Sequence, residues 1–162
     1  MSDLEDYSLL LFDLLVGRGL TMTAAESCTG GLISKIMTDH PGSSEVFWGS
    51  FISYSNDSKK RLLNIKSSIL DSYGAVSGET VRAMSLGALR LSRASCSVSV
   101  SGIAGPGGGS DLKPVGTVWI CAALKGGPLK MENFLFQGNR SIVRNKTAAA
   151  ALKMLYHLIL EN

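Results

Sequence analysis

The run VGTVWICAAL at positions 115–124 constrains the fold more than any other stretch of the sequence. It is apolar without interruption, which is typical of a strand that is buried on both faces of its sheet. Such a strand needs helices above and below it. Helical and strand patterns alternate along the rest of the chain, so we predict an α/β protein that forms a three-layer α/β/α sandwich.

Strand patterns cover four further segments, at 21–26, 46–55, 97–104 and 130–137. The tight turn Gly126-Gly127-Pro128 joins the last two strands and indicates one antiparallel member in a mixed, mostly parallel sheet. Helical patterns cover 4–16, 28–38, 57–63, 67–73, 78–92 and 140–160. The length of 162 residues and the lack of a linker predict a single domain over 1–162.

The composition argues against several classes of protein. The net charge of +3 is mild and unclustered, which argues against a nucleic-acid partner. Three cysteines without framework spacing argue against a disulfide scaffold. The acidic start of the chain lacks the features of a signal peptide, and no run of about 18 apolar residues suggests a membrane span. We therefore expect a soluble, cytoplasmic protein with no membrane contact.

Two potential nucleophiles, Ser27 and Cys28, stand where a predicted strand gives way to a predicted helix in AESCTGGLISKI. The start of a helix exposes unpaired backbone N–H groups, and these can stabilise the oxyanion of an acyl-transfer reaction. The two glycines that follow let a ligand approach the backbone closely. We favour Ser27 as the nucleophile, while the simpler alternative is that Ser27 or Thr29 caps the helix.

A serine nucleophile needs a base, and the sequence offers few candidates. Only His40 and His157 are histidines, and neither belongs to a recognisable constellation. A neutral lysine can serve instead, provided that burial or nearby positive charge lowers its pKa. Lys59 and Lys60 in YSNDSKKRLL both qualify, and the residues alone do not choose between them. A solvated basic helix face is the alternative interpretation.

Two features predict an anion-binding site. The loop GIAGPGGGSDLKPVG at 102–116 can point several N–H groups at a phosphate, with Lys113 adding charge, although it can also be a plain connector. Arg140 and Arg144 fall on or near the inward face of the last helix, at its N-terminal end. Such arginines pair either with a carboxylate of the fold or with a bound phosphate.

Five motifs in this order resemble the CinA C-terminal domain family over roughly residues 5–160: AESCTGG, YSNDSKKRLL, GAVS, GIAGPGGGSDLKPVGTV and GNRSIVR. The resemblance implies a three-layer fold, a homo-oligomer and no cofactor or metal. The members that this chain resembles are nicotinamide mononucleotide amidohydrolases, so the implied partner is a small-molecule pyridine nucleotide. Ser101 stands where the family commonly has threonine, and Asp57-Ser58 replaces the usual Glu-Ala before the lysine.

The resemblance also implies roles for individual residues. The catalytic serine of the family falls on Ser27 and its lysine on Lys59, which resolves the choice between the two lysines. Substrate-binding positions are implied throughout the motifs, at Thr29, Gly30, Gly31, Tyr54, Gly105, Pro106, Gly107, Gly108, Lys113, Arg140 and Arg144. A non-catalytic nucleotide-binding accessory module of the competence/damage-inducible type is the alternative function. The presence of both catalytic residues favours the enzyme.

Overall fold

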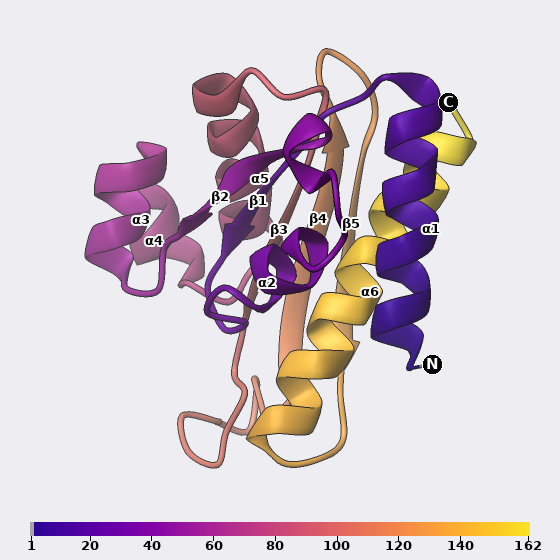
Figure 1. Ribbon diagram of the computed structural model, residues 1–162. Helices are drawn as coiled ribbons and strands as arrows, with labels where there is room; N and C mark the ends of the chain where they lie inside the picture. The colour runs from indigo at the N-terminus through magenta and orange to yellow at the C-terminus, as the bar shows by residue number, and fades with distance from the viewer. Residues whose placement is uncertain (1) are drawn as a thin grey trace.

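A mixed sheet of five strands forms the middle layer of the structure, a computed structural model that describes residues 2–162 (Figure 1). Its strand order is β2-β1-β3-β4-β5. The strands are β1 (Met22–Glu26), β2 (Phe47–Ile52), β3 (Cys96–Gly102), β4 (Thr117–Leu124) and β5 (Leu129–Leu135). β4 alone runs against the others, because it pairs antiparallel with both β3 and β5. The predicted mixed, mostly parallel sheet is confirmed.

Helices cover both faces of this sheet, as the apolar run in β4 requires (Figure 1). One face carries α1 (Asp3–Arg18), α2 (Leu32–Thr38) and α6 (Arg140–Leu160). The other carries α3 (Asn56–Leu63), α4 (Ser67–Tyr73) and α5 (Gly78–Ser92). A short 3₁₀ turn, Ser43–Glu45, precedes β2. Each face has its own cluster of buried apolar side chains, so the predicted three-layer sandwich is confirmed.

Helix starts follow local capping chemistry where the sequence supplies a capping side chain. Ser77 accepts a hydrogen bond from the Thr80 N–H and begins α5, and Asn139 begins α6 in the same way. The helix predicted over 28–38 is shorter than expected, because α2 begins only at Leu32. Its cap position is Gly31, which has no side chain to offer, so the preceding turn is held by a different group.

The carboxyl ends of β1, β2 and β3 lie at the same end of the sheet, because these three strands are parallel neighbours. The segments that leave them are therefore brought together although they are far apart in sequence.

Gly116, before β4, packs so closely on the residue that follows β5 that a Cβ there would lie 2.1 Å from the Phe136 carbonyl oxygen. Within residues 2–162, no helix combines the length and apolar character needed to span a bilayer.

Candidate active site

Ser27 and Lys59 meet at the carboxyl end of the sheet. Ser27 directly follows β1, and Lys59 lies in α3, which follows β2. The Nζ of Lys59 is 2.9 Å from the Oγ of Ser27. Both side chains are almost fully enclosed, with 7% of Ser27 and 1% of Lys59 exposed. A buried amine in hydrogen-bond contact with a serine hydroxyl is the geometry that a general base and its nucleophile require.

The environment of Lys59 makes its amine easier to deprotonate than that of an ordinary lysine. Besides Ser27, its Nζ contacts the carbonyl oxygens of Ser53 at 2.9 Å and Tyr54 at 3.4 Å. Burial lowers the pKa of Lys59 from the ordinary 10.5 to about 8, against a smaller raising effect from Cys28. An uncharged amine keeps two hydrogens for the two carbonyls and turns its lone pair to the Ser27 hydroxyl.

The alternative nucleophile and bases are poorly placed. Burial raises the pKa of the Cys28 thiol to about 12, so the thiolate is scarce at neutral pH. Lys60 is exposed on the outer face of α3. His40 contacts Ser8 and stacks on an aromatic ring of α1, and His157 packs between tyrosines of α1 and α6.

The turn after Ser27 leaves two backbone donors free. The Gly30 N–H bonds back to the Ser27 carbonyl and the Gly31 N–H bonds to the Glu26 side chain, so neither is available to a ligand. The N–H groups of Cys28 and Thr29 have no acceptor in residues 2–162. Buried amides are rarely left unpaired. Of these two residues Cys28 lines the cavity whereas Thr29 is fully enclosed, so the Cys28 N–H is the donor of this turn that is available to an oxyanion.

The same turn also excludes the simple capping role for its side chains. α2 begins beyond it, and the Thr29 hydroxyl donates to a Glu26 oxygen at 2.7 Å rather than to the start of the helix. Thr29 is fully buried, so its side chain has no free surface for a substrate. Gly30 and Gly31 adopt φ values of 58° and 100°, a region that glycine enters without strain.

A cavity of about 210 Å³ opens at the dyad. Its walls include the dyad and residues from four other segments: Tyr54, Val76, Ser101 and Arg140. A larger groove of about 810 Å³ lies between α1, α2, α6 and β5, but it contains neither Ser27 nor Lys59. The smaller cavity is the candidate active site, because it alone of the two reaches a nucleophile and its base.

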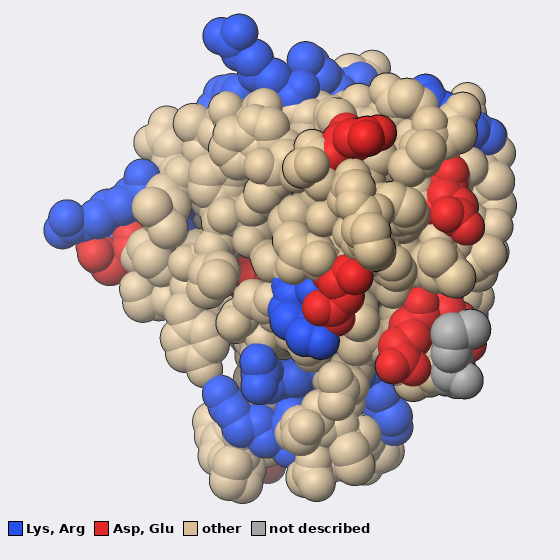
Figure 2. All heavy atoms as spheres, in the orientation of Figure 1, with Lys and Arg blue, Asp and Glu red and all other residues tan. Residues whose placement is uncertain are grey.

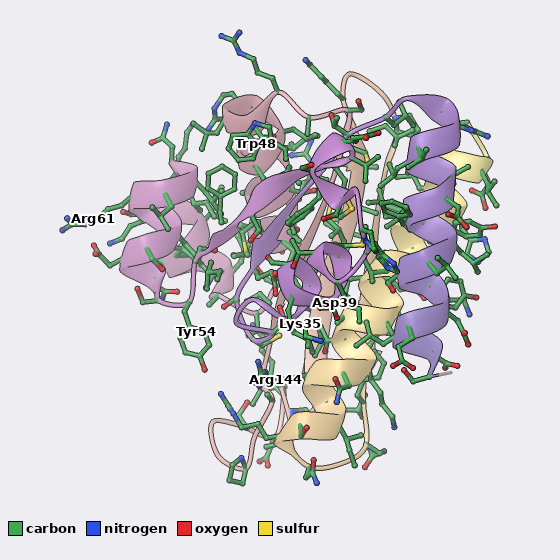
Figure 3. The ribbon with its side chains drawn as sticks, viewed as in Figure 1. Lys35, Asp39, Trp48, Tyr54, Arg61 and Arg144 are labelled. Carbon is green, nitrogen blue, oxygen red and sulfur yellow. The ribbon has the colours of Figure 1, made fainter. Side chains whose placement is uncertain are left out.

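Arg140 and Arg144 extend from the first turns of α6 toward the dyad. Arg140 donates to the Gly105 carbonyl at 2.9 Å and to the Tyr54 hydroxyl at 2.8 Å, and Arg144 donates to the Thr29 carbonyl at 2.6 Å. In the described part of the chain, no ion pair involves either arginine. Figure 3 shows Tyr54 and Arg144 at the end of the molecule where β1 and β2 terminate. These guanidinium groups are therefore free to meet an anion.

The glycine-rich loop contributes only its first part to the cavity. Gly105 is buried beside the cavity, whereas Pro106, Gly107 and Gly108 are exposed beyond it. Lys113 donates to the Tyr73 carbonyl at 3.2 Å, which ties the loop to the end of α4. Figure 2 shows basic side chains gathered over this loop and the start of α6. The loop forms a cationic rim outside the cavity.

One contact of the site carried no signal in the sequence: the carbonyl of Ser53 holds Lys59. A backbone carbonyl leaves no pattern that can be read without the fold. Ala75 and Val76 of the GAVS motif line the cavity from the segment before α5, although the motif alone gave them no role. Glu26 had a signal, because it is the one acid in an otherwise uncharged strand, directly before the nucleophile.

Comparisons with known proteins identify the family of the chain. A family model described as the CinA C-terminal domain matches residues 5–159. The chain belongs to the CinA C-terminal domain family. Among its relatives is the Escherichia coli K12 "Nicotinamide-nucleotide amidohydrolase PncC", 44% identical over 161 residues, which are 99% of this chain and 98% of that protein.

Other family members are longer proteins or solved structures. A "CinA-like protein" of Syntrophomonas wolfei is 48% identical over 141 residues, which are 87% of this chain but 34% of that protein. The crystal structure of the competence/damage inducible protein CihA from Agrobacterium tumefaciens matches with a TM-score of 0.95 at 39% identity. That match covers 98% of this chain and 96% of the other. The α/β fold is thus that of known CinA proteins.

Proposed function

We propose that the protein is a nicotinamide-nucleotide amidohydrolase, which converts nicotinamide mononucleotide to nicotinate mononucleotide and ammonia. The observation that carries this proposal is the buried contact of 2.9 Å between Lys59 and Ser27. The similarity to the amidohydrolase of E. coli over nearly the full length of both chains supports the choice of substrate.

The reaction begins with the uncharged amine of Lys59, which accepts the proton of the Ser27 hydroxyl as Oγ attacks the carboxamide carbon. The free N–H group of Cys28, which lines the cavity, stabilises the negative charge that develops on the carboxamide oxygen. The Lys59 ammonium then donates its proton to the leaving nitrogen, and ammonia departs. A water molecule, deprotonated by Lys59, attacks the acyl carbon. The bond to Ser27 Oγ breaks, the Lys59 ammonium returns its proton to Oγ, and the carboxylate product leaves.

The substrate contacts follow from the charges around the cavity. The cavity of about 210 Å³ suits the pyridine ring and its carboxamide but leaves the ribose phosphate outside. Arg140 and Arg144 present guanidinium groups at the mouth, where they suit a phosphate. Arg140 is free to exchange its bond to the Tyr54 hydroxyl for a charge-assisted bond to the anion.

Arg140→Ala is expected to raise KM for nicotinamide mononucleotide by roughly 10-fold and to change kcat little, because the arginine contacts the non-reacting phosphate. Steady-state kinetics will measure both constants. Arg61→Ala is the matched control, since Arg61 is exposed on α3 and pairs with Asp57 (Figure 3). An unchanged KM together with a lower melting temperature would make Arg140 a structural residue.

Wild-type protein is expected to release ammonia from nicotinamide mononucleotide, with kcat/KM rising with pH through a midpoint near the pKa of Lys59, about 8. The rise reflects loss of the proton that blocks the lysine from acting as a base. An ammonia assay from pH 6 to 10, in buffers of constant ionic strength, measures it. Binding of the nucleotide without ammonia release would instead favour the non-catalytic accessory module.

The homo-oligomer stays a prediction of the family resemblance, and the cytoplasmic location stays a prediction of the composition. Size-exclusion chromatography with light scattering tests the first of these. Neither is needed for the reaction as proposed, because Ser27, Lys59 and the free Cys28 N–H all come from one chain.

A further inference from the structure

The carboxyl group of Glu26 is fully buried at the end of β1, one residue before the nucleophile. Its two oxygens receive five hydrogen bonds, all from the turn and the first residues of α2. The donors are the Thr29 and Ser34 hydroxyls and the N–H groups of Gly31, Ile33 and Ser34, at 2.6 to 3.1 Å. No basic side chain is among them, so the carboxyl group serves backbone and hydroxyl donors alone.

This arrangement decides which amides of the turn remain free. Glu26 takes up the N–H groups that begin α2, and the Gly30 N–H closes a turn onto the Ser27 carbonyl. The Cys28 and Thr29 N–H groups are left without an acceptor in residues 2–162, and Cys28 lines the cavity beside Ser27. Arg144 of α6 also donates a hydrogen bond to the Thr29 carbonyl at 2.6 Å. This contact holds the turn in place in addition to the bonds that Glu26 accepts.

We propose that Glu26 is a positioning residue, whose carboxylate folds the 27–34 segment around itself so that the Cys28 N–H is held beside Ser27 for the reacting carboxamide. The inference rests on the proposed function. Glu26 does not touch the substrate, and it acts through the turn. A hydrogen bond between the Ser34 and Ser50 hydroxyls links the 27–34 segment to β2, the strand that leads to Lys59.

The chemistry of the group favours a carboxylate at this position. An ionised carboxylate only accepts hydrogen bonds, and all five partners are donors. A glutamine has nearly the same shape but replaces one acceptor oxygen with an NH₂ group, which would face at least one backbone N–H that cannot accept a hydrogen bond from it. Glu26→Gln therefore disturbs the turn while it removes almost no volume. Lys59 is held by the Ser53 and Tyr54 carbonyls, which lie outside the 27–34 segment.

The test compares Glu26→Gln with wild type in two assays and uses Glu132→Gln, an exchange on β5 away from the cavity, as the matched control. We expect kcat to fall about 10²-fold, the loss typical of an oxyanion-hole defect, with KM changed less than about 3-fold. The pH midpoint near 8 should not move, because the contacts of Lys59 are intact. If Glu26 only capped α2, Glu26→Gln would lower the melting temperature but would not lower kcat selectively over KM.

The second assay does not depend on the substrate. A fluorophosphonate reacts when Ser27 Oγ forms a bond to phosphorus and fluoride leaves, while Lys59 takes the serine proton. The same free N–H of Cys28 stabilises the phosphoryl oxygen, so Glu26→Gln is expected to be labelled about 10²-fold more slowly. If the wild-type protein is labelled but releases no ammonia from nicotinamide mononucleotide, the proposed substrate is refuted. The labelling rate of Glu26→Gln relative to wild type still tests the role of Glu26. Wild type that is neither labelled nor active overturns both proposals.

Glu26→Gln that melts at a lower temperature but keeps wild-type kcat and labelling rate overturns the inference. If Glu26→Gln does not fold, Ser34→Ala decides, because it removes one donor and the link to Ser50 while the carboxylate remains. A kcat reduced at least about 3-fold at unchanged KM, with labelling slowed in parallel, supports the positioning role. A kcat equal to that of wild type overturns it.

Discussion

Ser27→Ala is expected to abolish ammonia release, with kcat lowered by about 10⁴-fold or more. The variant keeps the amine, the free Cys28 N–H and the arginines but has no oxygen to form the acyl-enzyme. Its affinity for nicotinamide mononucleotide should stay close to that of wild type, because the proposed phosphate contacts come from Arg140 and Arg144 of α6 and not from Ser27. Ammonia detection and calorimetric titration of the same sample measure the two quantities.

Cys28→Ala is the matched control for this variant, since the two residues are adjacent and both line the cavity. Its thiol has a pKa of about 12 and is not ionised at neutral pH, so turnover should remain within a few-fold of wild type. If Ser27→Ala turned over normally while Cys28→Ala did not, the thiol would be the nucleophile and the proposed dyad would be refuted.

Lys59→Met is expected to lower kcat by about 10³-fold, within the range that general-base assistance contributes. Methionine fills a similar volume but cannot accept the Ser27 proton. Lys60→Met, which alters an exposed neighbour on the same helix, should keep wild-type activity. Loss of activity in Lys60→Met instead would place the base one residue along the chain.

Lys59→Met is also expected to differ from wild type in free energy of unfolding by an amount that depends on pH. The pKa of Lys59 is about 8 in the folded protein and near the ordinary 10.5 when unfolded. Below pH 8 the native state must bury an ammonium, which opposes folding. As pH rises from 8 to 10.5, the unfolded state binds more protons than the folded one, so wild type gains stability there.

Lys59→Met lacks this titration and should melt a few °C above wild type at pH 7. From pH 7 to pH 10 the wild type should gain about 2 kcal/mol on the variant in free energy of unfolding. Urea titrations at both pH values measure that change, and Lys60→Met serves again as the reference. A difference between Lys59→Met and wild type that does not vary with pH would mean that the lysine titrates normally.

The sequence was informative where a single residue dictates local structure. α5 runs over the predicted residues because Ser77 caps it, and α4 also matches its prediction. The alternation of helices and strands predicted the three layers. The strand order β2-β1-β3-β4-β5 could not be predicted, because it depends on pairing between segments that are remote in the chain.

The site was predictable in its motifs but not in its contacts. The residues alone left Lys59 and Lys60 equivalent, and burial separates them: Lys59 is 1% exposed, whereas Lys60 is exposed to solvent. The predicted start of the second helix was wrong because its capping group, Glu26, sits in the strand before the turn rather than at the helix start. A cap that reaches across a turn has no local sequence pattern.

The last helix both covers one face of the sheet and carries two arginines of the candidate site, and deletion experiments cannot separate these two roles. Its inner stripe, which includes Ala148, Leu152 and Leu155, shields one side of the sheet, and its first turns carry Arg140 and Arg144. A truncated chain without α6 would therefore expose the apolar face of the sheet and lose the proposed phosphate contacts at once. Mapping of substrate contacts in this family calls for single-residue exchanges at the beginning of that helix, rather than for shortened fragments.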